Sequence, residues 1–251
     1  MQIIVQGLLT HYQHSGQGKT ILLLHGWANS LDSFETLKAE LITSYDVISV
    51  DLPGFGKTQT PKSAWNLDDY SQFVKDFLDK LNIPNIYCVV GHSNGGALAI
   101  RALSTKQISA QKLVLLASSG VRNSKGIKNI AIKAVAKSGK VATFWLSPST
   151  KQKLQQKLYG TIGSDMLVAP HMKETFKLTV RQDIQADARK LDLPTLLIYG
   201  NKDKATPLKG VGEPLHRQIA NSRLEIVDGA DHFAHQTNPE QIQKLIMEFL
   251  S

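Results

Sequence analysis

Short apolar runs alternate with helical patterns along most of this chain of 251 residues, and that alternation limits the possible folds more than any other feature. Most runs are apolar throughout rather than at every second position, which is typical of strands buried on both faces of a parallel sheet. The predicted strands cover residues 3–5, 21–24, 47–50, 86–90, 113–117, 195–199 and 224–227.

Two helical stretches lie between and after these runs, at residues 67–81 and 242–250, and each places its apolar residues on one face. Asn66 and Asp68 provide capping groups for the first helix, and Asn238 followed by Pro239 favours the start of the second. Repeated strand–helix units predict a doubly wound α/β sheet, while Gly7 between two short runs indicates an antiparallel hairpin at the N-terminal edge.

Residues 121–190 depart from this pattern because they contain no strand-like run. They carry 14 Lys or Arg against 4 Asp or Glu, whereas the rest of the chain carries 15 against 17. Their apolar residues have helical spacing. We therefore predict an α/β core made of residues 1–120 and 191–251, and a helical lid inserted at 121–190.

The sequence Gly91-His92-Ser93-Asn94-Gly95-Gly96 follows one predicted strand and precedes a helical stretch. A nucleophilic serine on such a sharp turn requires glycine at flanking positions where a Cβ atom would clash, and Gly91 and Gly95 meet that requirement. The N-terminus of the following helix presents N–H groups to an anion forming at Ser93. Ser93 is therefore the candidate nucleophile.

Together with its surroundings, this motif resembles the α/β-hydrolase family, over nearly the whole chain except the insertion. The resemblance implies a mostly parallel sheet of eight strands with a helical lid. It also implies that the N–H groups of Trp27 and Asn94 bind an oxyanion, with His25 and Gly26 in the same loop and His92 supporting the elbow. The segments that carry it are 22–27, 51–56, 91–96, 196–203 and 229–233.

Serine is a weak nucleophile at neutral pH and needs a nearby base, which in turn needs a carboxylate to orient it. His232 lies in a glycine-containing loop after a predicted strand, and His235 is its serious rival as base. Asp203 follows the strand at 195–199 and is the predicted acid. Residues 118–120, where some relatives place the acid, contain no carboxylate. We expect Asp231 to point elsewhere and Asp51 to be structural.

Other site classes fit the sequence less well. Gly56-Lys57-Thr58 lacks the upstream glycine of a P-loop, and no group of His, Cys and carboxylate residues has metal-ligand spacing, so we predict no metal and no cofactor. No nucleic-acid recognition motif is present. Residues 122–157 carry nine basic and no acidic residues. They fit a lid with solvated lysines, or a surface that contacts anionic membranes or substrates.

These features predict a cytoplasmic serine hydrolase that cleaves small carboxylic esters. The opening residues lack the basic start of a signal peptide, and the single cysteine, Cys88, lies in an apolar run. A carbon–carbon bond hydrolase of ring-cleavage products is the alternative enzyme, although His92 and Phe233 stand where such relatives often carry Asn and Trp. A non-catalytic ligand-binding protein is the alternative from another class. The sequence leaves the oligomeric state open.

Overall fold

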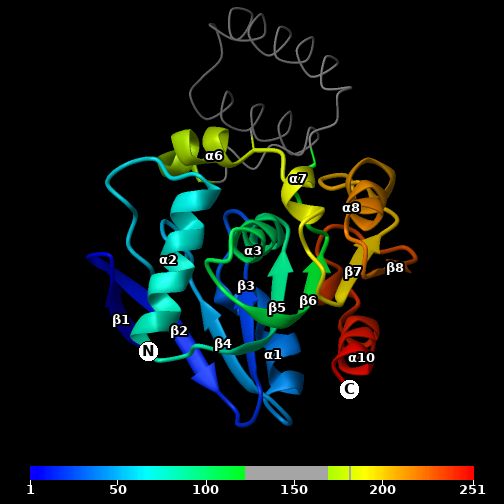
Figure 1. Cartoon of the computed structure of the whole chain (residues 1–251), viewed down its shortest axis with the longest axis horizontal. Coiled ribbons are helices and arrows are strands. Elements are labelled where there is room, and N and C mark those ends of the chain that lie inside the picture. The colour runs from blue at the N-terminus through cyan, green and yellow to red at the C-terminus, as the bar shows by residue number, and fades with distance from the viewer. Residues whose placement is uncertain (122–168, 181) are drawn as a thin grey trace, which may run out of the picture.

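The computed structural model describes residues 1–121, 169–180 and 182–251 (Figure 1). Within these residues, eight strands form one sheet in the order β1-β2-β4-β3-β5-β6-β7-β8. The strands are β1 (Gln2–Val5), β2 (Leu8–Ser15), β3 (Thr20–Leu24), β4 (Asp46–Val50), β5 (Ile86–His92), β6 (Ala110–Leu116), β7 (Thr195–Gly200) and β8 (Ser222–Val227).

The strand pairing confirms the predicted doubly wound, mostly parallel sheet. Strands β3 to β8 are parallel to one another, whereas β1 and β2 form the antiparallel hairpin at the edge and β2 also runs antiparallel to β4. From β3 the chain adds β4 on one side of the sheet, and from β5 onward it adds strands on the other side. The topology therefore switches between the neighbouring strands β3 and β5. Ligands of open α/β sheets bind at the carboxyl ends of strands near such a switch, which is where β5 leads into the candidate nucleophile.

The helices in the described part of the chain cover both faces of the sheet (Figure 1). Two apolar clusters, one on each face, form the core. One cluster includes apolar residues of α2, α3, α7 and α8, and the other includes those of α1, α9 and α10. These helices are α1 (Glu35–Leu41), α2 (Leu67–Lys80), α3 (Asn94–Ser104), α7 (Gln185–Ala188), α8 (Glu213–Gln218), α9 (Ala234–Thr237) and α10 (Pro239–Leu250).

The two helices predicted from sequence are present, and their starts differ in detail. Asn66 caps α2 through a capping box in which its side chain accepts from the N–H groups of Asp68 and Asp69, while the Asp69 carboxylate accepts from the N–H of Asn66. At α10, Pro239 occupies the first turn, but the Asn238 side chain makes no capping hydrogen bond. Proline alone therefore marks that helix start.

The predicted lid at 121–190 is described only in part. Residues 122–168, which include the whole basic stretch at 122–157, lie outside the described residues, so the lid and its boundaries remain predictions. The described return segment contains the short helix η4 (Pro170–Met172) and α6 (Lys173–Thr179), followed by α7. Hydrogen bonds join it to the core from His171 to Gly54, from Trp65 to Thr175 and from Leu67 to Gln182.

Among the described residues, none of the helices has the length and apolar character needed to cross a bilayer.

Candidate active site

Ser93 sits on a strained turn between β5 and α3, as the glycine pattern predicts. Its φ of 51° and ψ of −116° lie in a region that residues with a side chain rarely adopt. A Cβ atom on Gly91 would lie 2.6 Å from the carbonyl oxygen of Gly95, and one on Gly95 would lie 2.1 Å from that of Leu24. Glycine is thus required by close packing of the main chain around the serine.

An unbroken line of hydrogen bonds joins three side chains from distant parts of the sequence. The Oγ of Ser93 lies 3.0 Å from the Nε2 of His232, and the Nδ1 of His232 lies 2.8 Å from the Oδ2 of Asp203. Ser93 follows β5, Asp203 follows β7 and His232 follows β8, so all three come from the carboxyl edge of the sheet. The structure therefore brings the predicted nucleophile, acid and base together.

Asp203 makes four hydrogen-bonding contacts, and its side chain has no exposed surface. Its Oδ1 accepts from the main-chain N–H groups of Ala205 and Thr206, and its Oδ2 lies against the Thr206 hydroxyl and the His232 ring. Burial acts to raise the pKa of Asp203, but the hydrogen bond and charge of His232, together with Thr206, outweigh burial and lower it. The carboxylate is therefore held in its charged form.

The loop that carries Gly26 and Trp27 packs directly on the serine. A Cβ atom on Gly26 would lie 2.8 Å from the Nδ1 of His92 and 3.1 Å from the Cβ of Ser93. The Trp27 ring packs edge-on against the Phe55 ring, with 4.8 Å between the ring centroids. It also packs at a tilt against the Phe176 ring of α6, with 5.0 Å between the centroids. Asn94 is the first residue of α3, where N–H groups have no partner within the helix. Asn94 thus directly follows Ser93, and Gly26, the residue before Trp27, packs against it.

His25 and His92 support these loops through the main chain. His25 accepts from the N–H of Leu52 at Nε2 and lies 2.8 Å from the carbonyl oxygen of Gly26 at Nδ1. The Nε2 of His92 lies 2.9 Å from the carbonyl oxygen of His232. Since a carbonyl only accepts, His92 donates from Nε2. Burial, followed by the neighbouring His235 and His232, holds the pKa of His92 well below its ordinary value, so its ring is neutral.

The rival residues occupy other positions. His235 is buried, its ring lies 4.4 Å from that of His92, and its Nε2 has no hydrogen-bond partner among the described residues. Asp231 accepts from the N–H of Phe233. Asp51 accepts from the main-chain N–H groups of Leu31 and Lys57 and pairs with His11, which fits the structural role expected for it.

Thr206 belongs to the site although the sequence pattern did not single it out. Its Oγ lies 2.8 Å from the Oδ2 of Asp203, 2.9 Å from the carbonyl oxygen of Ala117 and 3.2 Å from the Nδ1 of His232. The available signal was the spacing of Asp203 and Thr206, since an Asp side chain often accepts from a main-chain N–H two or three residues later. That signal indicates a turn but not a contact with His232.

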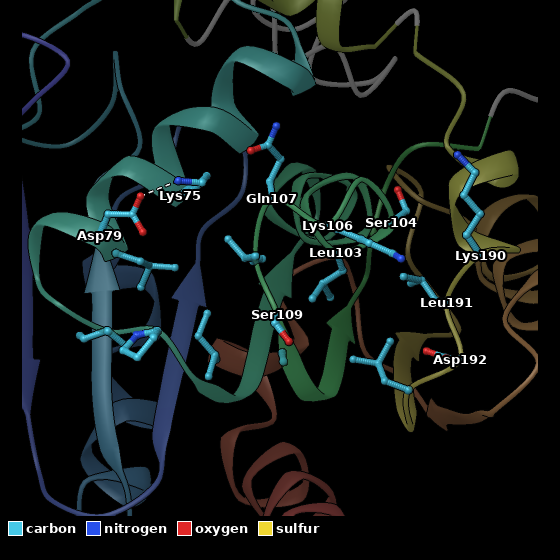
Figure 2. Close-up of a pocket in the computed structure, with 17 residues that line it drawn as sticks. Lys75, Asp79, Leu103, Ser104, Lys106, Gln107, Ser109, Lys190, Leu191 and Asp192 are labelled. Carbon is cyan, nitrogen blue, oxygen red and sulfur yellow. Dashed lines mark hydrogen bonds and ion pairs between the residues drawn. The ribbon is translucent and has the colours of Figure 1, made fainter.

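A cavity of about 180 Å³ adjoins the site, lined in part by Asn94, Ala97, Ala205, Thr206 and Val211. A larger groove of about 810 Å³ lies at the other end of the sheet, where β5 and β6 begin. Figure 2 shows that groove, with Lys75 paired to Asp79. Ser93, Asp203 and His232 line neither cavity, but the smaller one is lined by their neighbours Asn94 and Thr206.

The residues described by the structure contain no group of three or more His, Cys, Asp or Glu side chains placed to hold a metal ion. Cys88 is buried in β5 and is the single cysteine of the chain, so it forms no internal disulfide bond.

A doubly wound sheet that carries a serine elbow and a linked histidine and aspartate defines a hydrolase fold, and the comparison with known families agrees. The model of the alpha/beta hydrolase fold family matches residues 19–239. The chain belongs to this family.

Individual proteins with related sequences or folds are distant. The chain is 27% identical to the uncharacterized hydrolase YugF of Bacillus subtilis, over 96% of this chain and 92% of that protein. It is 26% identical to a pimeloyl-(acyl-carrier protein) methyl ester esterase of Neisseria meningitidis, over 92% and 93%. The structure of a meta-cleavage product hydrolase from Pseudomonas fluorescens superposes with a TM-score of 0.74 at 21% identity, covering 99% of this chain and 96% of that one.

Proposed function

We propose that this protein is a carboxylic ester hydrolase that works through an acyl-enzyme, with Ser93 as nucleophile, His232 as base and Asp203 as the acid. The observation that carries the proposal is the continuous hydrogen-bonded line from Ser93 through His232 to Asp203. Serine gains nucleophilicity only when a base can take its proton, and histidine serves best when a carboxylate fixes its tautomer.

In the first half-reaction, the Oγ of Ser93 attacks the acyl carbonyl carbon while the Nε2 of His232 takes its proton. Asp203 holds the Nδ1–H of His232 and stabilises the imidazolium that forms. The tetrahedral intermediate then collapses, and His232 returns the proton to the departing alcohol. In the second half-reaction, His232 activates water in the same way, and the carboxylic acid leaves Ser93.

The main-chain N–H groups of Trp27 and Asn94 are the proposed donors to the oxyanion. Trp27 follows Gly26, which packs against Ser93, and Asn94 begins α3, so the partial positive charge of that helix end also favours the anion. A donor of this kind lowers the barrier by roughly 3 kcal/mol. His92 supports the mechanism by remaining neutral, since a second cation beside His232 would oppose formation of the imidazolium.

The size of the adjoining cavity favours small substrates. Its volume of about 180 Å³ corresponds to roughly six water-sized groups, well below the range for drug-sized ligands. The relative from Neisseria meningitidis is named for cleavage of a methyl ester. We propose esters with a short acyl group as the substrate class.

A panel of p-nitrophenyl acetate, butyrate and octanoate tests this function on the wild type and on Ser93→Ala. We expect turnover that is greatest for the short esters, and a loss of at least about a thousandfold in kcat for Ser93→Ala. Wild-type turnover that survives in Ser93→Ala would refute the assignment of the nucleophile. A preference for octanoate would refute the proposed substrate size.

The carbon–carbon hydrolase reaction uses the same three residues and stays an alternative prediction. Ring-opened dienone acids added to the panel distinguish it, because an ester hydrolase should turn them over far more slowly than p-nitrophenyl acetate. A non-catalytic binding protein should hydrolyse neither kind of compound.

A further inference from the structure

We infer that Thr206 is a positioning residue whose hydroxyl holds the Asp203 carboxylate in register with His232. This inference rests on the proposed function, because Thr206 would act on the reaction by positioning Asp203, the proposed acid. Its basis is the position of one buried oxygen between three groups, two of which belong to the hydrogen-bonded line.

The Thr206 hydroxyl completes the set of donors around Asp203. An ionised carboxylate offers about four acceptor positions, and the four contacts of Asp203 occupy them. Thr206 supplies two of the four, through its N–H to Oδ1 and its hydroxyl to Oδ2. Because the Asp203 side chain has no exposed surface, bulk water does not replace a donor that is removed.

The same hydroxyl connects the loop that carries Asp203 and Thr206 to the end of β6, which also contacts the nucleophile. Its oxygen lies 2.9 Å from the carbonyl oxygen of Ala117, at the end of β6. The preceding residue, Leu116, accepts from the N–H of Ser93 over 3.0 Å. A hydroxyl has one proton and donates to either Asp203 or Ala117 at a given moment, and the two short contacts together fix its oxygen.

The third contact places Thr206 next to the base. Its oxygen lies 3.2 Å from the Nδ1 of His232, so this N–H points toward both Asp203 and Thr206. A valine at 206 has nearly the same shape as threonine but cannot donate. The Oδ2 of Asp203 would then keep His232 as its one side-chain partner, and the orientation of the carboxylate would depend on fewer bonds.

Four variants test this role with the short p-nitrophenyl ester. Thr206→Val and Thr206→Ala remove the hydroxyl, Thr206→Ser keeps it, and Thr195→Val is the matched control. Thr195 is also buried and donates to a main-chain carbonyl, but it is the first residue of β7, at the end of that strand away from Asp203. We expect kcat to fall roughly tenfold in Thr206→Val and Thr206→Ala, with KM within about twofold of wild type. Thr206→Ser and Thr195→Val should retain wild-type kcat.

The pH profile separates positioning from a general loss of packing. Without the hydroxyl, Asp203 holds the Nδ1–H of His232 with one orienting contact fewer, so the hydrogen bond between the two side chains should change. The pH dependence of kcat/KM should therefore differ from wild type in Thr206→Val and match it in Thr206→Ser. The other titratable groups that bear on the His232 ring in the described structure, His92 and His235, are unchanged in these variants.

The nuclear magnetic resonance signal of the Nδ1–H proton of His232 gives a readout that needs no substrate, because this N–H points toward Asp203 and Thr206. The inference is overturned if Thr206→Val and Thr206→Ala keep wild-type kcat and an unshifted Nδ1–H signal of His232, or if Thr206→Ser is as impaired as Thr206→Val. Failure of the proposed function has a different signature, namely ester turnover that is absent from the wild type or insensitive to Ser93→Ala.

Discussion

The Nε2 of His92 donates a hydrogen bond of 2.9 Å to the main-chain carbonyl oxygen of His232. His92 directly precedes the candidate nucleophile, so this bond connects the serine elbow to the loop that carries the candidate base. It fixes the main chain of His232, whereas Asp203 fixes the ring. The position of the imidazole relative to Ser93 therefore depends on both contacts.

Replacing His92 should impair the chemical step more than substrate binding. In His92→Ala the carbonyl of His232 loses its donor, and we expect kcat to fall by about tenfold with little change in KM, which corresponds to the loss of one hydrogen bond. His92→Gln provides an amide donor and should recover part of that loss. Equal and undiminished kcat values for both variants would show that the bond does not position the base.

Burial of His235 should make the protein less stable as the pH falls below neutral. Burial lowers the pKa of His235 from 6.5 to about 4. Between these values the unfolded chain takes up a proton at this residue and the folded protein does not, so the free energy of unfolding should decrease as the pH drops. One such group contributes up to about 1.4 kcal/mol per pH unit.

Urea unfolding of the wild type and His235→Gln at pH 7, 6 and 5 measures this contribution. The variant should lose less stability between pH 7 and pH 5 than the wild type. His14→Gln is the control, because His14 lies on an exposed part of β2. The same pH dependence in the wild type and His235→Gln would contradict a buried neutral His235.

Gly95 should tolerate a methyl group far less well than an exposed glycine does. A Cβ atom at Gly95 would lie 2.1 Å from the carbonyl oxygen of Leu24, so the elbow and β3 would have to separate. At Gly229, which has a φ of 73°, a Cβ atom would meet nothing within 4 Å. Gly229→Ala should cost about 1 kcal/mol through its backbone conformation alone, whereas Gly95→Ala should cost several times more. Thermal denaturation of the two variants measures the difference, and similar Tm values would contradict the close packing.

Much of the fold follows from local patterns in the sequence. The continuous apolar runs predict β3 to β7 because strands covered on both faces need no polar positions, whereas β8, at the sheet edge, keeps Arg223 and Glu225. Asn66 predicts the start of α2 because its side chain caps it. The extent of β2 does not follow in the same way. After Leu8 and Leu9, Tyr12 is the one apolar residue of this strand, and the strand forms through pairing with β1 and β4.

The site residues that lie in sequence motifs can be predicted from the sequence. The residues that the tertiary fold brings to the site cannot. Ser93, Asp203 and His232 each follow a predicted strand, and parallel strands bring such positions to one edge. Thr206 has no motif of its own, and its contacts with Ala117 and His232 depend on how three loops pack. The bond from His92 to the main chain of His232 is likewise invisible in the sequence, because a carbonyl acceptor leaves no residue preference.

Labelling with a fluorophosphonate probe tests the central claim most directly. The probe reacts covalently with a serine that a neighbouring base activates. We predict a single adduct on Ser93 in peptide mass spectra of the wild type, no adduct in Ser93→Ala, and labelling of His232→Ala that is slower by orders of magnitude. An unmodified Ser93 in the folded wild type, or equally fast labelling in His232→Ala, would contradict the account.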